Sequence, residues 1–192
     1  MTLVLAVHNN NSIVIGSDSF RGNIQNNSKT YNDAKKMYEI TNNCYVLVAG
    51  NGINKDEVDD FLNSFSCNIK KLKLVNINDI YNKFKDLLCD KFKKDGPRST
   101  NEPLIFILVG FQDSKPKFFK FDSRDGFSEY KDFKIVAGID DQYVYKELDK
   151  SGLVQSTTSK QTEVIVRKVL ETTHNKYPNA VDEPYKIKTL RP

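Results

Sequence analysis

Residues 2–19 read TLVLAVHNNNSIVIGSDS, two short apolar runs on either side of a polar turn. Residues 3–7 and 12–17 are rich in Val and Ile and have the length of β-strands. The turn Asn9-Asn10-Asn11 between them therefore predicts a β-hairpin. The first strand of this hairpin begins directly after Thr2.

Thr2 becomes the first residue of the chain if Met1 is removed. A hydroxyl is a poor nucleophile without an adjacent base. A free α-amine titrates at about 7.7–8.0, much nearer to neutrality than a lysine at about 10.4. Nucleophile and base would then share one residue, with little positioning entropy left to lose. Methionine removal commonly exposes a threonine, so Thr2 has to be weighed together with the rest of the sequence.

Length and composition indicate one globular domain. The chain has 192 residues, enough to bury a core, so we expect a single domain over residues 2–192. The net charge of +4 arises largely between residues 70 and 94. Aromatic residues there, such as Tyr81 and Phe84, fall on the apolar side of a helical pattern. The lysines are then its solvated face, and we expect no nucleic-acid partner.

Cysteine and histidine usage disfavours metal and disulfide chemistry. Cys44, Cys67 and Cys89 show no CxxC spacing, and His8 and His174 are the only histidines. This pattern predicts no metal site, no cofactor and a reducing compartment. No signal peptide is evident, and no apolar run approaches the roughly 20 residues of a membrane span. We therefore expect a cytoplasmic protein without a membrane partner.

The next part of the chain predicts a loop and a second strand pair. Residues 19–33 are polar and rich in Asn and Ser, which favours a loop. Residues 36–40 and 44–49 form the strand pair, which turns at Asn42-Asn43. The pattern then breaks at Gly50-Asn51-Gly52.

Two helices are expected after this break. Apolar residues between positions 58 and 65, and again between positions 77 and 88, follow the i, i+3, i+4, i+7 spacing of one helix face. Asn76 or Asn78 is the expected N-cap of the second helix, and Gly96-Pro97 ends it.

The second half of the chain predicts more strands and another helix pair. Residues 104–109 are continuously apolar, as in a strand buried on both faces. The other expected elements are paired strands at 117–122 and 126–134, a strand at 135–138, helices at 140–150 and 160–173, and a final strand at 185–190. This order favours two sheets enclosed by helical layers over alternating βαβ units.

Three segments resemble the proteasome β-subunit family of N-terminal nucleophile (Ntn) hydrolases. They are VIGSDS at residues 14–19, KMYEI at residues 36–40 and VAGNG at residues 48–52. Together with Thr2, they occur in the family's order, and the resemblance runs through nearly the whole chain. It implies an α+β fold, a four-layer αββα sandwich of two mainly antiparallel sheets flanked by helices.

The resemblance assigns catalytic roles to Thr2, Asp18, Lys36 and Gly50. A buried Lys36 would favour deprotonation of the Thr2 hydroxyl, and Asp18 would balance the lysine charge. Gly50 would offer its backbone N–H to the oxyanion.

The resemblance also places Ala34, Val48 and Gly52 at substrate-binding positions. These residues suggest a neutral, apolar side chain before the scissile bond. Taken one at a time, the catalytic residues have plainer interpretations: Asp18 as a turn cap, Lys36 as a solvated lysine, and Gly50 as a strand exit.

Three positions depart from the family pattern. Ile139 and Asn179 stand where active members usually carry serines, and Lys176 stands where they carry an aspartate. Those groups normally orient the threonine amine and its proton-transfer water. We expect His174, two residues before Lys176, to be a packed residue at the end of a helix.

The sequence therefore predicts a threonine-type peptidase that acts on peptides or unfolded proteins. The resemblance implies a ring-forming homo-oligomer, with an α-type ring or an ATPase cap as candidate partners. Two alternatives stay open. One is a catalytically silent structural ring subunit, and the other is an amidase or transpeptidase acting on one defined motif.

Overall fold

The computed structural model describes residues 3–19, 22–23, 28–29, 35–50, 55–95 and 104–192. Contacts within the chain gather into two compact units. The first unit comprises Met1–Lys36 and Asp132–Arg191, and the second comprises Met37–Lys131. A single domain over residues 2–192 stays a prediction.

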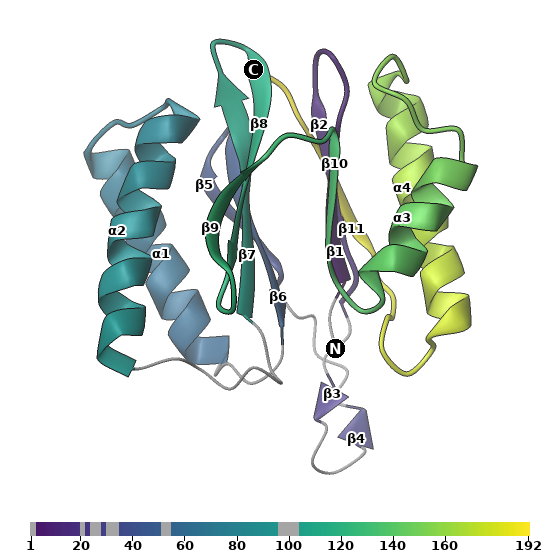
Figure 1. The fold of residues 1–192 in the computed structure, drawn as a ribbon, viewed down its shortest axis with the longest axis horizontal. Helices are drawn as coiled ribbons and strands as arrows, with labels where there is room; N and C mark the ends of the chain where they lie inside the picture. Colours follow the sequence, from purple (N-terminus) through teal and green to yellow (C-terminus); the bar gives the residue numbers. More distant parts are fainter. Residues whose placement is uncertain (1–2, 20–21, 24–27, 30–34, 51–54, 96–103) are drawn as a thin grey trace. The chain divides into compact units, whose positions relative to one another are not determined.

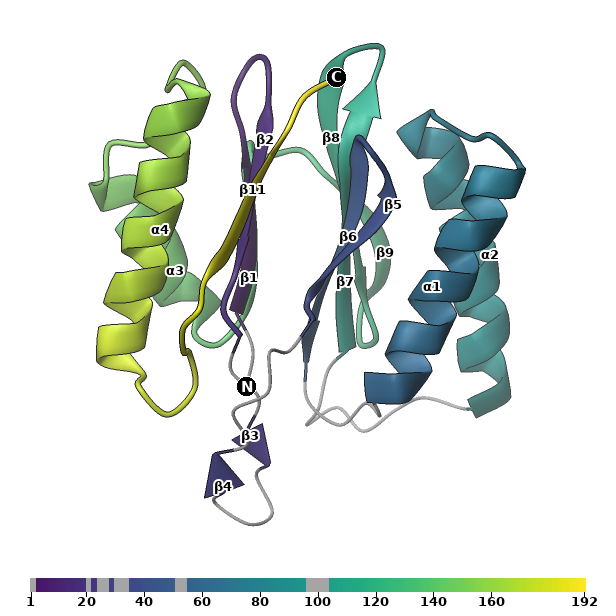
Figure 2. The same ribbon diagram turned by 180° about the vertical axis from the view of Figure 1, so that it is seen from behind.

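The first unit is built on a four-stranded antiparallel sheet in the order β10-β1-β2-β11. Its strands are β1 (Leu3–His8), β2 (Ile13–Ser17), β10 (Lys134–Gly138) and β11 (Lys186–Leu190). The predicted hairpin is confirmed, with β1 and β2 paired from Val4↔Ser17 to His8↔Ile13. Two helices, α3 (Asp141–Lys150) and α4 (Ser159–Lys176), lie along one face of this sheet (Figures 1 and 2).

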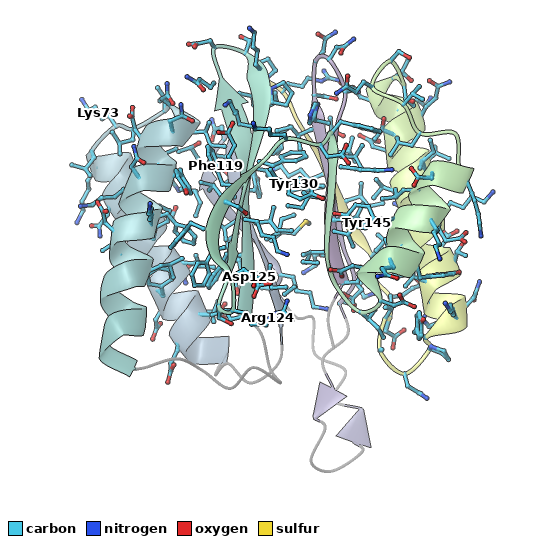
Figure 3. The ribbon with its side chains drawn as sticks, viewed as in Figure 1. Lys73, Phe119, Arg124, Asp125, Tyr130 and Tyr145 are labelled. Carbon is cyan, nitrogen blue, oxygen red and sulfur yellow. The ribbon has the colours of Figure 1, made fainter. Side chains whose placement is uncertain are left out.

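Alternate side chains of β1 pack beneath α3 and α4. Leu3, Leu5 and Val7 share an apolar cluster with side chains of both helices: Val144, Leu148, Val166, Val169 and Leu170. Tyr145 of α3 (labelled in Figure 3) accepts a hydrogen bond from the Val136 N–H of β10 at 3.0 Å. The intervening residues of β1 are also fully buried, which explains why this strand is continuously apolar instead of alternating.

The second unit contains a five-stranded antiparallel meander, β5-β6-β7-β8-β9. The strands are β5 (Met37–Thr41), β6 (Cys44–Gly50), β7 (Leu104–Gln112), β8 (Lys115–Asp122) and β9 (Gly126–Tyr130). Helices α1 (Lys55–Lys71) and α2 (Ile77–Asp95) cover one face (Figure 1). Phe119 of β8, labelled in Figure 3, stacks on Tyr81 of α2 with ring centroids 4.1 Å apart. Asn76 is the N-cap of α2, because its side chain accepts the Asn78 N–H at 2.8 Å.

The predicted α+β class is confirmed, with two main antiparallel sheets of four and five strands and four helices in the described residues. Two local predictions are wrong. The polar stretch 19–33 contains a two-residue strand pair, β3 (Gly22–Asn23) and β4 (Ser28–Lys29), which is too short and polar to leave a periodic signal. The strand predicted at 126–134 ends at Tyr130. Exposed Lys131 and Asp132 follow it, and β10 begins at Lys134 in the other sheet.

Two further features concern the limits of the described part of the chain. Gly96-Pro97, the expected end of the second helix, lies outside the described residues. Among the residues that are described, none of the helices is both long and apolar enough to cross a membrane.

Gly16 in β2 provides a test of the packing beneath α4. A Cβ atom at this position would lie 2.6 Å from Cγ1 of Val166, a contact so close that the Val166 side chain or its helix would have to shift. We expect Gly16→Ala to lower the free energy of unfolding by about 1–3 kcal/mol. In a Val166→Ala background the same change should cost less than about 1 kcal/mol, as measured by urea unfolding. Equal costs in both backgrounds would contradict this packing.

Candidate active site

Asp18 lies immediately after β2 and is held against the start of β1. Its backbone N–H donates to the Leu3 carbonyl at 3.2 Å, which extends the hairpin ladder by one bond. Its side-chain Oδ1 accepts the Leu3 N–H at 2.8 Å. This N–H belongs to the peptide group that joins Leu3 to Thr2. The carboxylate is therefore bonded to the main chain one peptide group from the candidate nucleophile.

Lys36 forms an ion pair with the same carboxylate oxygen. Its Nζ donates to Oδ1 of Asp18 at 2.6 Å, and the lysine side chain is only 6% exposed. Asp18 is fully buried. A buried charge is costly unless it is paired and hydrogen-bonded, and here each ion satisfies the other. The structure thus brings together two of the residues expected at the site and excludes a solvated Lys36.

The pKa of Lys36 is lowered from its ordinary value. Burial is the largest cause, because removal from water disfavours the charged ammonium. Asp18 opposes this effect through its charge and its hydrogen bond, while the positive charge of Lys186 adds to the lowering. Lys36 is consequently easier to deprotonate than an ordinary lysine.

The other expected site residues are placed as follows. Gly50 ends β6 in the second unit, with a φ of 131° that L side chains rarely adopt. Val48 is half-buried in the same strand and packs on the apolar cluster of that unit. Thr2, Ala34 and Gly52 lie outside the described residues. The oxyanion role of Gly50 and the substrate contacts of Val48 stay predictions.

Lys176 is engaged at the surface, where α3 begins and α4 ends. Its Nζ lies 3.6 Å from the ring centroid of Tyr143 and 3.5 Å from Oδ2 of Asp140. The Tyr177 hydroxyl donates to the same Asp140 oxygen. Asp140 is itself the N-cap of α3, so this exposed cluster ties the ends of the two helices together.

The structure also describes the other two residues that depart from the family pattern. Ile139 is buried in the apolar cluster beneath α3 and α4, and its side chain cannot supply the hydroxyl of the serine that the family pattern implies here. Asn179 is exposed. His174 lies in the last turn of α4, and its Nδ1 is 2.6 Å from the carbonyl oxygen of Val181, which follows the helix. This contact agrees with the packing role expected for His174.

Three polar residues near Asp18 belong to no motif in the sequence. Ser17 is fully buried, and its hydroxyl has no hydrogen-bond partner among the described residues. Lys186 is paired with Ser17 across the sheet. The pKa of Tyr185 is raised to about 12, mainly by burial, with further contributions from Glu183, Glu171, Asp182 and Asp18. The sequence indicates only that two of them, Tyr185 and Lys186, lie in the strand predicted at 185–190. It does not indicate that this strand pairs with β2, because that pairing is set by the tertiary fold.

The groups available for chemistry at this site are the Asp18 carboxylate and the amines of Lys36 and Lys186. In the part of the chain that the structure describes, no three His, Cys, Asp or Glu side chains gather as metal ligands. Cys44 and Cys67 are free thiols, and Cys44 is buried in the second unit. A proton can be held and exchanged at Lys36, and Asp18 can hold a positive charge close to the start of β1.

The Asp18–Lys36 pair should be strongly coupled in stability. We expect Asp18→Asn and Lys36→Met each to lower the free energy of unfolding by about 3–5 kcal/mol, because each leaves one buried ion unpaired. The loss of unfolding free energy in the double variant, measured by urea unfolding, should be smaller than the sum of the two single losses by at least about 2 kcal/mol.

Lys35→Met is the matched control for this measurement, because it changes the exposed neighbouring lysine. Its effect should stay within about 0.5 kcal/mol. Additive effects of the Asp18 and Lys36 variants would show that the two side chains do not interact in the folded protein.

Comparison with known proteins gives one match. The family model for proteasome subunits matches residues 2–182 of this chain. The matched range begins at Thr2 and includes both members of the buried ion pair. A search of curated proteins found no match.

Proposed function

Because this chain belongs to the proteasome subunit family, we propose that it is a threonine-type peptidase of the β-subunit kind. In this proposal Thr2 is the nucleophile that cleaves peptide bonds after Met1 has been removed. The observation that supports it best is the Asp18 carboxylate, whose Oδ1 accepts hydrogen bonds from both Lys36 Nζ and the Leu3 N–H. A single buried oxygen atom thereby links the lysine ammonium to the main chain next to Thr2.

The proposed reaction uses the free α-amine of Thr2 as its base. The Thr2 hydroxyl oxygen attacks the scissile carbonyl carbon, and its proton passes to the α-amine. The Lys36 ammonium favours the loss of this proton, because a nearby positive charge stabilises the developing alkoxide. The Gly50 N–H would stabilise the oxyanion, a contribution of about 3–4 kcal/mol for one donor. The intermediate collapses to a threonyl ester as the proton moves to the leaving amine, and water then hydrolyses the ester.

Substrates and partners follow from the same proposal. Ala34, Val48 and Gly52 would line a pocket for a neutral, apolar side chain of a peptide or unfolded protein. Proteasome subunits generally form ring oligomers, and a homo-oligomeric ring is proposed here, in the cytoplasm. An α-type ring or an ATPase cap would be its partner.

Substitution of Thr2 tests the reaction. We expect Thr2→Ala to reduce peptide cleavage by about 10⁴-fold or more, because it removes the nucleophile. Thr2→Ser keeps a hydroxyl and an α-amine, and should retain measurable activity. The assay uses fluorogenic peptides and the purified protein, with intact-mass analysis to establish whether Met1 has been removed.

Covalent trapping identifies the nucleophile independently of turnover. An epoxyketone or β-lactone probe should attach to Thr2, as mapped by peptide mass spectrometry. Labelling of another residue, or full activity of Thr2→Ala, would overturn the mechanism. Transfer of the acyl group to an added amine in place of water would identify a transpeptidase.

A catalytically silent ring subunit is the second candidate, and two observations favour it. Ile139 is packed in an apolar cluster and carries no hydroxyl, and Lys176 is held in the exposed cluster with Asp140 and Tyr143. This candidate predicts a ring-sized complex that retains Met1 and takes up no probe. A complex of the same size that loses Met1 and is labelled at Thr2 would exclude it.

A further inference from the structure

Segment 182–186 runs along Asp18 and contacts both of its neighbours in the chain. Lys186 of β11 is directly opposite Ser17, the residue before Asp18. The backbone N–H of Ser19, the residue after Asp18, donates to the Asp182 carbonyl at 3.1 Å. Asp18 is therefore held on one side by the β1 main chain and flanked on the other by the start of β11.

The side chains of Ser17 and Lys186 lie on the same face of the sheet. Directly opposite residues of an antiparallel pair project to one face, with Cβ atoms about 4.5–5.5 Å apart. Gly16 faces α4, because a Cβ there would meet Val166. Ser17 and Lys186 therefore project from the opposite face, where Ser17 is fully buried and Lys186 is partly buried.

We propose that Lys186 is a positioning residue of the candidate site, a second cation that β11 holds beside the buried Asp18–Lys36 pair. The inference rests on the proposed function, since it concerns the protonation of the amines that the peptidase would use. Lys186 would not touch the substrate. It would act on the α-amine of Thr2, as a like charge that favours the neutral amine, and its effect on the pKa of Lys36 reports the same charge.

Electrostatics around Lys36 agrees with this role. Asp18, at the end of β2, raises the pKa of Lys36, while Lys186 of β11 lowers it. Three acidic side chains act on the neighbouring Tyr185: Glu171 on α4, and Asp182 and Glu183 before β11. These three raise the pKa of the Tyr185 hydroxyl. Lys186 is thus the neighbouring cation that opposes Asp18 at Lys36.

The effect on the α-amine follows from connectivity. Thr2 is joined to Leu3, whose N–H is bonded to Asp18, so the amine of a chain that starts at Thr2 is close to the same charges. One carboxylate alone would favour the protonated amine, which cannot accept the proton of the hydroxyl. With the two cations Lys36 and Lys186 around that carboxylate, the local charge would instead favour the neutral α-amine. Lys186 would therefore extend the activity of the site toward lower pH.

The test is the pH dependence of kcat/KM, whose acidic limb reports the base of the free enzyme. We expect Lys186→Gln to move this limb up by about 0.5–1 pH unit, and Lys186→Glu to move it further. Lys186→Arg keeps the charge and should leave the limb within about 0.2 unit of wild type. Lys188→Gln is the matched control, because Lys188 lies on the same face of β11, opposite Ile15 and one pair farther from Asp18.

A second readout does not need an active enzyme. Competitive acetylation with acetic anhydride across a pH series, quantified for each residue by mass spectrometry, gives the pKa of Lys36 in the full chain. It should rise in Lys186→Gln and stay unchanged in Lys188→Gln. An unchanged Lys36 pKa, or a Lys188 effect as large as that of Lys186, would overturn the inference. If Thr2→Ala kept full activity, the proposed function would fail, and the acetylation result would still decide the role of Lys186.

Discussion

A single carboxylate oxygen fixes the geometry on which the candidate site depends. Oδ1 of Asp18 accepts the Leu3 N–H at 2.8 Å and Lys36 Nζ at 2.6 Å, in a position that water does not reach. Both ions are costly to bury, and hydrogen bonds to charged groups contribute about 1.5–3 kcal/mol each when they are made. The burial of Asp18 is therefore coupled to the burial of Lys36 and to the observed register of β1.

The position of β1 in the sheet strengthens this constraint. A terminal strand often lies at an edge, where its first residues fray. Here β1 is internal, with β2 on one side and β10 on the other, and Leu3 is paired with Gly138. Leu3 also contributes its fully buried side chain to the cluster under α3 and α4. The main chain next to Thr2 is thus fixed by pairing on two sides and by packing on one face. A nucleophile positioned through it would start close to its reactive geometry.

Hydrophobic periodicity was sufficient to predict most of the fold. The strand runs, the two helices with one apolar face, and the cap at Asn76 all depend on local sequence, and the structure confirms them. Prediction failed where the chain leaves one sheet and enters the other, because the local sequence pattern does not mark that point. Residues 126–134 contain β9 and the first residue of β10, and only Lys131, Asp132 and Phe133 separate the strand of one sheet from that of the other.

The site was only partly predictable for a related reason. Lys35 and Lys36 are adjacent and chemically identical, and composition cannot tell which one is buried; the family resemblance of residues 36–40 was needed. Lys186 left no motif at all, since its proximity to Asp18 arises from the pairing of β11 with β2.

In the proposed peptidase, charge balance would let the site work without the acidic residue that the family resemblance implies at position 176. A protonated terminal amine beside Asp18 would be stabilised by that carboxylate and lost as a base. Lys36 offsets the carboxylate charge directly, and the charge of Lys186 adds to the lowering of the Lys36 pKa, of which burial is the largest cause. Lys176, by contrast, is exposed and neutralised by Asp140, so its positive charge adds little to the field at Asp18. In this proposal, burial together with Asp18 at the end of β2 and Lys186 at the start of β11 would set the protonation state of the amines at the site.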